Sequence, residues 1–363
     1  MKTLQKIFVE GGRQYVGQYG HSMPGVHRKA LRAMQNCRTG KMGRSHFSCP
    51  HCHRHESANC SCSNRHCPTC QAGKGLEWFD KHVQRMLPCN YFMVTFTVPT
   101  QMHRVIRSHQ RELYSALFTS AWQSMTKLAR DPRLLGAHTL GAIGVLHTWT
   151  RQVGFHPHIH FLVPAGGLDR EGNWIRARQE EILPVRALSK LFRAKMRDAL
   201  KCLGMFDEVD PTAWAIDWNV NCENKGNGRR SLEYLSAYLF RVAITDSRIV
   251  RVDHETVTFR YKKQKSDKYK NCTVTRMEFL RRFLQHVLPT GFVKVRHFGF
   301  LSAHAKHSIA RIAKMIAEGL LCWPMPPSDT TTAPRGFICT CGTRMVFAGF
   351  SKPHSNTREA MVT

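Results

Sequence analysis

The sequence GFHPHIHFLV at residues 154–163 places histidines at every second position of a short apolar run. Such a run is typical of a buried β-strand. Side chains alternate between the two faces of a strand, so His158 and His160 share one face, roughly 6.5–7 Å apart at their Cα atoms. Two imidazoles held side by side by a sheet can bind a divalent metal ion. The alternative is a pair of histidines on a polar face without a metal. Other motifs of the chain are needed to choose between a metal-binding pair and this alternative.

The charge of the chain points to a polyanionic partner. The 363 residues contain 54 Lys and Arg against 25 Asp and Glu, a formal net charge of +29. A balance this positive repels itself unless a polyanion neutralises it, so nucleic acid is the first partner to consider. An anionic membrane surface is second, but no strongly basic amphipathic helix favours it.

The sequence also indicates a soluble intracellular protein. The N-terminal MKTLQKIFVEGGRQ lacks the apolar core of a signal peptide, and no apolar run approaches the roughly 20 residues that span a bilayer. Fourteen cysteines in such a chain are expected to be metal ligands and buried thiols rather than disulfides. We therefore expect a cytoplasmic, nucleoid-associated protein.

Six of the cysteines lie in the segment FSCPHCHRHESANCSCSNRHCPTCQ, residues 47–71. Two Cys-x-x-Cys motifs in it predict one structural zinc site with four thiolate ligands: Cys49, Cys52, Cys67 and Cys70. The crowding leaves two alternatives open, a second ion or the replacement of one motif by Cys62 and His66. Near the C-terminus, Cys339-Thr-Cys341 has a shorter spacing, which disfavours chelation by both of its thiolates.

The apolar pattern predicts an α+β fold. Strands are expected at 91–98, 141–149, 156–164 and 174–176, a basic hairpin at 256–275, and helices at 26–36, 76–86, 101–130, 185–202, 277–287 and 303–318. Residues 223–230 read as a turn-rich lead-in to a helix, and 322–336 as a Pro- and Thr-rich linker. We expect a basic zinc-binding module at 1–77, a catalytic domain at 78–320, and a linker and tail at 321–363.

The predicted helix from Ser231 carries Tyr234 and Tyr238 at positions i and i+4, which places both on one helical face. A phenol is a poor nucleophile at its free pKa near 10, but a metal ion and arginines beside a phosphate can make it effective. Arg241 lies one turn further and Arg248 follows the helix. Alone, this pattern is more typical of core packing.

Several stretches together resemble one family. They are SNRHCPTCQ, HPHIHFLVPAGGL, YLSAYLFRVAITDSRI and FLQHVLPTGFVKVRHFGFL, behind a Phe96-Thr-Val-Pro99 strand. Over roughly residues 20–310 the chain resembles the two-tyrosine HUH transposases of rolling-circle insertion sequences, the insertion sequence ninety-one group. The resemblance implies a five-stranded antiparallel sheet with packed helices (HUH endonuclease-like) and a small N-terminal zinc ribbon.

The resemblance also implies a chemistry. Mg²⁺ or Mn²⁺ would be held by His158 and His160, with a third ligand among His147, His156, Gln152 and Glu233. Tyr234 and Tyr238 would attack phosphates in single-stranded DNA and form 5′-phosphotyrosine links. Arg65, Arg241 and Arg248 are expected to contact DNA. No Walker motif is present, so strand separation would come from a host helicase or replication machinery.

Three alternatives remain open from the sequence. A plasmid or phage replication initiator or relaxase would use the same nicking chemistry. A zinc-dependent DNA-binding protein without catalysis would keep the charge and the cysteines alone. A metallohydrolase would use His156, His158 and His160 as ligands, although no carboxylate stands beside them as a general base.

Overall fold

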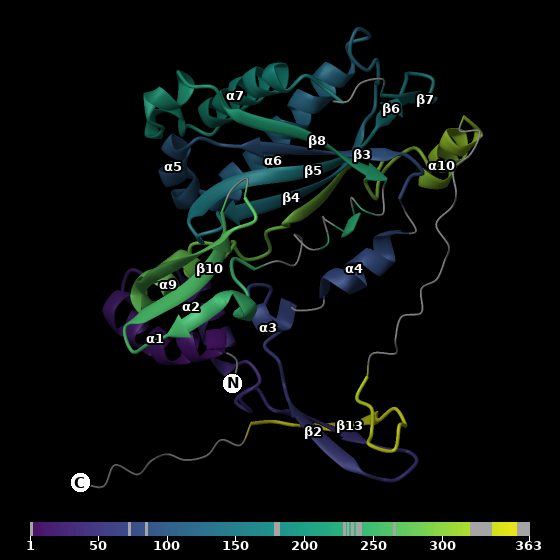
Figure 1. Ribbon diagram of the computed structural model, residues 1–363. Coiled ribbons are helices and arrows are strands. Elements are labelled where there is room, and N and C mark those ends of the chain that lie inside the picture. The colour runs from purple at the N-terminus through teal and green to yellow at the C-terminus, as the bar shows by residue number, and fades with distance from the viewer. Residues whose placement is uncertain are drawn as a thin grey trace.

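A five-stranded antiparallel sheet forms the centre of the molecule. The computed structural model describes residues 3–71, 74–83, 86–177, 182–227, 230, 232–233, 236, 242–263, 266–319 and 336–353. The strand order is β12-β4-β5-β3-β8, with bounds β3 Asn90–Thr97, β4 Gly141–Trp149, β5 Phe155–Pro164, β8 Asn219–Asn227 and β12 Val295–Gly299. The histidine strand, β5, is the middle strand (Figure 1). The α+β antiparallel fold class is confirmed.

One face of this sheet is covered by helices α5 (His103–Ser108), α6 (Gln110–Ala129) and α7 (Val185–Cys202) (Figure 1). Alternate residues of β3 and β5 point into the interface, where Phe96 meets Phe192 of α7 with ring centroids 5.1 Å apart. Phe161 meets Phe118 of α6 at 6.3 Å. These aromatic contacts form the largest apolar core and leave the opposite sheet face to carry the histidines.

That opposite face divides into an apolar end and a polar end. At the apolar end, residues of β3, β4 and β5 pack beneath α10 (Ile309–Glu318) and the short β6 (Gly166–Leu168) and β7 (Trp174–Arg176). The polar end carries the histidines. Side chains alternate between the two faces of a strand, so every second residue of β5 points to this face. Leu162 lies at its apolar end, and His158 and His160 lie at its polar end.

A second layer combines helices and strands from distant parts of the chain. It contains α1 (Thr3–Tyr19), α2 (Gly25–Asn36), α9 (Arg276–Leu284) and the antiparallel sheet of β9 (Ile249–Val252), β10 (Thr256–Lys262) and β11 (Tyr269–Thr275). Phe8 of α1 and Phe283 of α9 meet edge to face, with ring centroids 4.8 Å apart. Helix α1 was not predicted, yet Leu4, Ile7 and Phe8 follow the i, i+3, i+4 spacing of a buried helical face.

A third, small sheet joins the two ends of the chain. Strand β1 (Arg44–Ser48) lies between β2 (His55–Asn59) and β13 (Val346–Ser351), antiparallel to both (Figure 1). The predicted terminal regions 1–77 and 321–363 thus share one sheet. Short helices α3 (Pro68–Gln71) and α4 (Lys74–Val83) lead from it toward the central sheet.

The predicted elements at 26–36, 76–86, 141–149, 156–164, 185–202, 256–275 and 277–287 all correspond to described elements of the same type. The strands that were not predicted are β1, β2, β6, β8, β9, β12 and β13. The sequence of β8, NVNCENKGN, is polar and Gly-containing because this strand lies at the edge of the sheet. Residues 223–227, expected as turn, therefore form half of a strand. Most of 322–336 and the predicted tyrosine helix lie outside the described residues.

Candidate active site and cysteine clusters

Three histidines meet on the polar end of the central sheet. His147 of β4 is the direct cross-strand partner of His158 of β5, and His160 lies two residues further along β5. Their imidazole nitrogens lie within 4.8 Å of one another. The ring centroids of His147 and His160, and those of His158 and His160, are each 4.8 Å apart. The predicted pair is thus brought together, and its third member is His147 rather than His156.

Hydrogen bonds orient both histidines of β5. Nδ1 of His158 lies 2.7 Å from the carbonyl oxygen of His156. A carbonyl only accepts, so Nδ1 carries the proton and Nε2 keeps its lone pair for a metal ion. Nδ1 of His160 lies 2.8 Å from Oγ1 of Thr95 on β3. Thr95 is the cross-strand partner of His160, so the sheet itself supplies this contact. Sequence reasoning missed Thr95, although it lies in the strand that had been predicted.

Burial keeps these imidazoles neutral. Burial, with a smaller contribution from the neighbouring His160, lowers the pKa of His158 to about 3. Burial also lowers the pKa of His160 to about 4, Lys225 acts in the same direction and Glu223 opposes them. Metal binding requires the neutral form, so both groups are ready to act as ligands at physiological pH. The two neutral imidazoles of β5, beside the imidazole of His147, fit a divalent ion.

Polar side chains of β8 extend the site beyond the histidines. Asn221 and Asn219 are the cross-strand partners of Thr95 and Thr97, so they share the face of the triad. Glu223 lies two residues further, where it accepts hydrogen bonds from Asn221, at 2.7 Å, and from Lys225. The site therefore contains a carboxylate, but one paired with a lysine and an amide.

A cavity of about 290 Å³ lies beside β4, the strand that carries His147. It lies at the end of the β4–β12 pairing, next to the pair Val145 and Val295. Leu146, Thr148 and Trp149 of β4 form one wall. The cationic side chains of Arg65 and Lys294 line it as well. Burial and the charge of Arg65 lower the pKa of Lys294 to about 7. Arg65, and Lys294 in its protonated form beside the ring of Trp149, are suited to a phosphate and a base.

The predicted nucleophiles Tyr234 and Tyr238, and Arg241 with them, lie outside the described residues. The described residues around them are consistent with the predicted helix, since Leu232, Glu233 and Ser236 are helical. After this segment, Val242 and Ala243 line the cavity beside β4. A few residues after the predicted tyrosines, the chain therefore lies close to β4, the strand that carries His147.

Two further predicted DNA contacts are described. Arg65 donates a hydrogen bond of 2.6 Å to the carbonyl oxygen of Phe292 while lining the cavity. Arg248 donates to the carbonyl oxygens of Arg260, at 3.0 Å, and Arg151, and its guanidinium lies 5.8 Å from the ring centroid of Phe259. These contacts fasten the β9–β10 sheet to the turn after β4.

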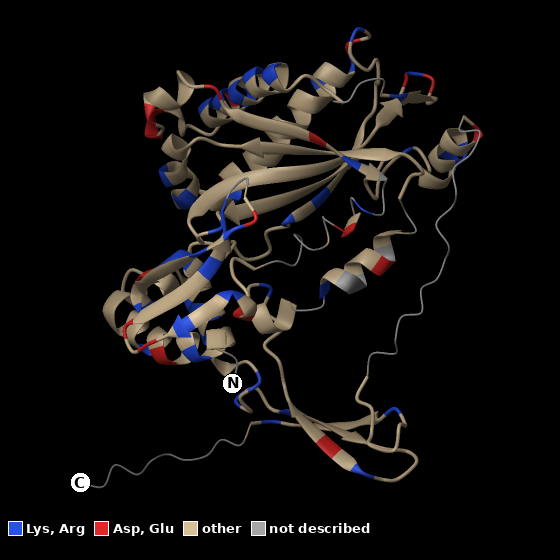
Figure 2. Cartoon of the chain, viewed as in Figure 1, with Lys and Arg blue, Asp and Glu red and all other residues tan. Residues whose placement is uncertain are grey.

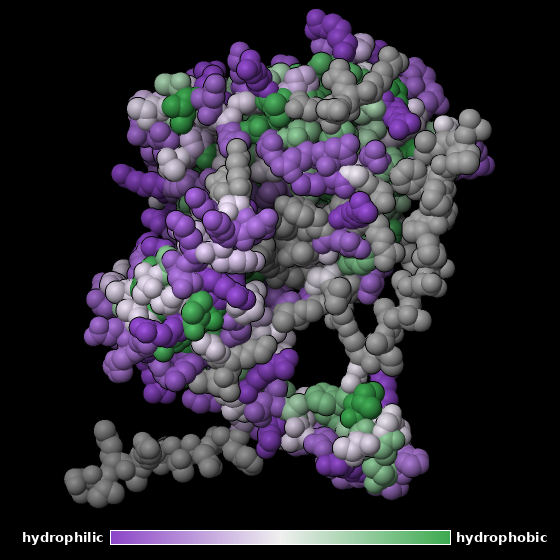
Figure 3. Space-filling view, in the orientation of Figure 1, coloured by the Kyte–Doolittle hydropathy of each residue, from purple (hydrophilic) through white to green (hydrophobic). Residues whose placement is uncertain are grey.

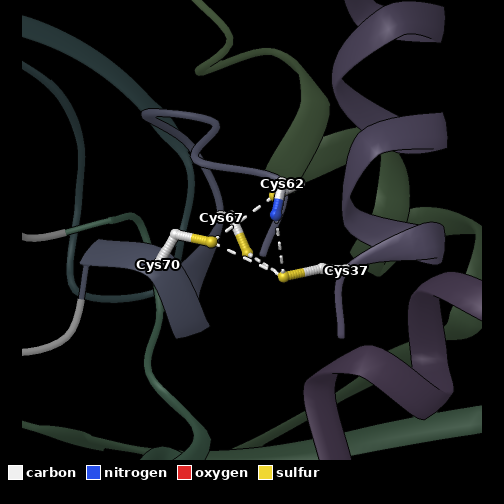
Figure 4. Close-up of side chains that lie close together, drawn as sticks. All are labelled: Cys37, Cys62, Cys67 and Cys70. Carbon is white, nitrogen blue, oxygen red and sulfur yellow. Dashed lines mark hydrogen bonds between the residues drawn. The ribbon is translucent and has the colours of Figure 1, made fainter. Parts of the chain in front are cut away.

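The first cysteine cluster combines residues from three segments: Cys37, Cys62, Cys67 and Cys70 (Figure 4). Cys37 lies directly after α2, and its sulfur is 3.5 Å from that of Cys70 and 3.8 Å from that of Cys67. Cys62 and Cys70 are 3.5 Å apart. A tetrahedral zinc ion with Zn–S bonds of about 2.3 Å separates its sulfurs by about 3.8 Å, so the cluster has the dimensions of a four-thiolate site.

The second cluster contains Cys49, Cys52, Cys339 and Cys341, whose sulfurs lie within 4.8 Å of one another. The prediction that Cys49 and Cys52 share one site with Cys67 and Cys70 is therefore wrong in its grouping. Each of the two motifs finds its partners elsewhere, because β1 pairs with β13 while α2 packs beside the segment 62–70. The short spacing was expected to disfavour chelation by both Cys339 and Cys341, yet both sulfurs lie in this cluster.

Comparisons with known proteins agree with this arrangement. Residues 141–308 match a family model described as "Putative transposase", and residues 7–98 match one described as "Transposase zinc-binding domain", of the IS91 type. "Putative transposase y4qJ" of Sinorhizobium fredii is 32% identical over 352 residues, 91% of this chain and 87% of the relative. "Transposase for insertion sequence element IS801" of Pseudomonas savastanoi pv. phaseolicola is 28% identical over 86% of this chain and 81% of the relative.

Among solved structures, the conjugative relaxase TrwC in complex with oriT DNA matches 32% of this chain and 44% of the relaxase, at 16% identity and a TM-score of 0.26. A likeness this slight carries no argument, and the fold assignment rests on the sheet itself. In the described part of the chain, no helix is long and apolar enough to cross a membrane. The identity and coverage of the sequence relatives decide the family: the chain belongs to the transposases of the IS91 and IS801 insertion sequences and contains their zinc-binding domain.

Proposed function

We propose that this protein cleaves and rejoins single-stranded DNA during rolling-circle transposition, through 5′-phosphotyrosine intermediates. The observation that carries the proposal is the triad of His147, His158 and His160 on the central strands of a transposase-family chain, in which burial favours neutral His158 and His160 and each of these two has a hydrogen-bond partner. In the proposed site these histidines hold Mg²⁺ or Mn²⁺. When bound, the ion neutralises phosphate charge and polarises a phosphate oxygen.

The residues of the chain have separate roles in this proposal. The triad and Thr95 fix where the scissile phosphate lies. The hydroxyl oxygen of Tyr234 or Tyr238 attacks phosphorus, the bond to the 3′ oxygen breaks, and the leaving oxygen takes up a proton to give a free 3′-OH. A second tyrosine allows a second cleavage while the first is still linked to DNA.

Positive charge supports a DNA substrate. Lys and Arg are spread over the helical layer, the β9–β11 sheet and the loops, while Asp and Glu are sparse (Figure 2). We propose that Arg65 and Lys294 of the cavity contact DNA phosphates near the site, and that Arg241 and Arg248 contribute further contacts. A host helicase or replication machinery would supply single-stranded substrate.

Zinc has a structural role in the proposal. The first cluster, Cys37, Cys62, Cys67 and Cys70, offers four thiolates and no open position, which is typical of a structural ion rather than a catalytic one. Cys37 and Cys67 belong to the apolar core beneath α1 and α2. Zinc there would hold the segment 62–70 against α2 within the layer that contains α9.

Two other functions make different predictions. A replication initiator or relaxase would nick DNA with the same residues but would not require element ends. A zinc-dependent DNA-binding protein would bind without forming any covalent product. The family relationship favours the transposase, since both sequence relatives carry that name.

The test is cleavage of a labelled single-stranded oligonucleotide that carries the element end, with Mn²⁺ present. The proteins compared are wild type, His158→Ala, Tyr234→Phe, Tyr238→Phe and the double tyrosine variant. We expect a covalent protein–DNA adduct in the wild type that is absent without metal, absent in His158→Ala and absent in the double variant. His138→Ala is the matched control, because His138 is an exposed loop residue.

The outcome separates the alternatives. Tight binding without any adduct on genuine end sequences would favour the non-catalytic protein. An adduct that forms equally well on a plasmid origin or an unrelated oligonucleotide would favour an initiator or relaxase.

A further inference from the structure

The second cysteine cluster joins two segments almost 300 residues apart in sequence. The sulfurs of Cys49 and Cys341 are 3.6 Å apart, and those of Cys52 and Cys339 are 3.4 Å apart. These separations are close to the roughly 3.8 Å edge of a tetrahedral four-thiolate zinc site. Residues 339 and 341 lie beyond both regions that match the transposase family models. The zinc-binding match contains Cys49 and Cys52, but neither match extends to the two C-terminal cysteines or pairs them with this motif.

Backbone conformation gives an independent indication. The residue directly after one cysteine of each segment has a positive φ: +58° at His53, after Cys52, and +83° at Gly342, after Cys341. The first cluster shows the same feature, with +57° at Arg38 and +48° at Ser63. Non-glycine residues rarely adopt this conformation, at a cost of about 1–3 kcal/mol. Three of the four such residues in the described chain follow cluster cysteines, so the strain is concentrated where a bound ion would offset it.

The small sheet around the cluster has too little apolar core to hold itself together. Cys49, Cys339 and Met345 are its buried core residues, with Phe47 packed against them. Large apolar side chains of the C-terminal segment are instead exposed, Phe347 at 63% and Phe350 at 54%. Hydrophobic surface gathers on this small sheet (Figure 3). Small modules without a sufficient core are commonly stabilised by disulfides or a structural metal.

From these three observations we propose that a second zinc ion, bound by Cys49, Cys52, Cys339 and Cys341, fastens residues 336–353 to the β1–β2 hairpin. The ion adds to the other connections between the two segments, which include β1–β13 pairing, a 2.8 Å hydrogen bond from Arg54 to Thr340 and a 2.9 Å hydrogen bond between the side chains of His46 and Ser351. The C-terminal segment is thereby part of the zinc-binding end of the molecule.

Zinc content of the full-length protein tests this proposal. The protein is purified under reducing conditions, dialysed without zinc, and its zinc per chain measured by atomic emission. We expect Cys339→Ser/Cys341→Ser to contain one zinc fewer than the wild type. Cys202→Ser is the matched control, an exposed cysteine outside both clusters, and should lose none. The zinc content of the variant is subtracted from that of the wild type, so an ion bound at the histidine triad or at the first cluster in both proteins does not affect the difference.

A conservative variant guards against general misfolding. Cys341→His should keep the second zinc, because imidazole replaces thiolate in many structural zinc sites. A protease site inserted between residues 327 and 328 gives a second readout. After cleavage, residues 328–363 should stay with the main fragment in size-exclusion chromatography and separate after chelation.

Three results would overturn the proposal. The first is equal zinc content in the wild type and in Cys339→Ser/Cys341→Ser. The second is a C-terminal fragment that remains bound after all zinc has been removed. The third is a thiol titration in which the unreduced wild type shows two free thiols fewer than its reduced form, while the double variant shows no such difference. That result would indicate a disulfide between the same segments.

Discussion

His147 and His158 are opposite residues of the antiparallel strands β4 and β5, so the triad depends on the register of this one hairpin. The hairpin turn fixes that register. Val153 in the turn has a φ of +62° and is fully buried, and its carbonyl oxygen accepts hydrogen bonds from the side chains of Gln285, at 3.2 Å, and His286, at 3.1 Å. A slip of one residue would turn His147 to the opposite face. The layer that contains α9 therefore helps to position the triad.

Removing His147 should therefore be as harmful as removing either histidine of β5. We expect His147→Ala, His158→Ala and His160→Ala each to lower metal-dependent adduct formation by at least about 100-fold, because each removes one proposed ligand. The initial rate of adduct formation with Mn²⁺ measures the effect. An active His147→Ala protein alongside an inactive His158→Ala protein would exclude His147 from the site.

Thr95 should act on metal affinity rather than on the chemical step. Thr95→Val removes the hydroxyl that contacts Nδ1 of His160 and keeps the side-chain volume. We expect the Mn²⁺ concentration for half-maximal cleavage to rise about 10- to 100-fold, with a near-normal rate at saturating metal. Thr95→Ser keeps the hydroxyl and should resemble the wild type. A lower rate at saturating metal with unchanged metal affinity would contradict this role.

Stability should fall in mildly acidic solution because of buried histidines away from the triad. Burial lowers the pKa of His286 to about 4 and that of His66 to about 3, from an ordinary value near 6.5. Between pH 4 and 6.5 the unfolded chain binds more protons than the folded chain, so the free energy of unfolding rises with pH there and levels off above it. Each such histidine contributes a slope of up to about 1.4 kcal/mol per pH unit.

Urea unfolding between pH 4.5 and 7.5, in a metal-free buffer, measures this slope. A His286→Gln variant should show a shallower dependence, because glutamine does not titrate and can still donate to the carbonyl oxygen of Val153. An unchanged slope in this variant would show that His286 is not responsible.

Loss of the first cysteine cluster should loosen the N-terminal helices. Cys37→Ser removes the ligand that connects α2 to the segment 62–70. We expect this variant to lose one zinc and to unfold at lower temperature, since zinc at about 1,000 times its Kd stabilises the folded state by about 4 kcal/mol. Calorimetry with Cys202→Ser as control tests this. Full zinc retention in Cys37→Ser would argue for Cys60 or His66 as a ligand instead.

Much of this fold and site followed from sequence because the signals were local. The alternation of β5, the apolar stripes of α2 and α7 and the basic hairpin β10–β11 all lie within single elements, where periodicity reports the buried face directly. The same periodicity places His158 and His160 side by side. Strand β8 escaped prediction because an edge strand exposed to solvent need not be apolar.

The third histidine of the triad and the grouping of the cysteines depend on tertiary structure. His147 joins the triad through the register of β4 against β5. The sequence does not show this register, so it left His147 as one of several candidates. Spacing alone paired the two nearest Cys-x-x-Cys motifs, whereas chain packing gives each motif partners from α2 or from the C-terminal segment. The residue types and their local spacing predicted that histidines and cysteines would gather into clusters. Which residues share a site depends on contacts between distant segments, and those contacts are fixed by the packing of the whole chain.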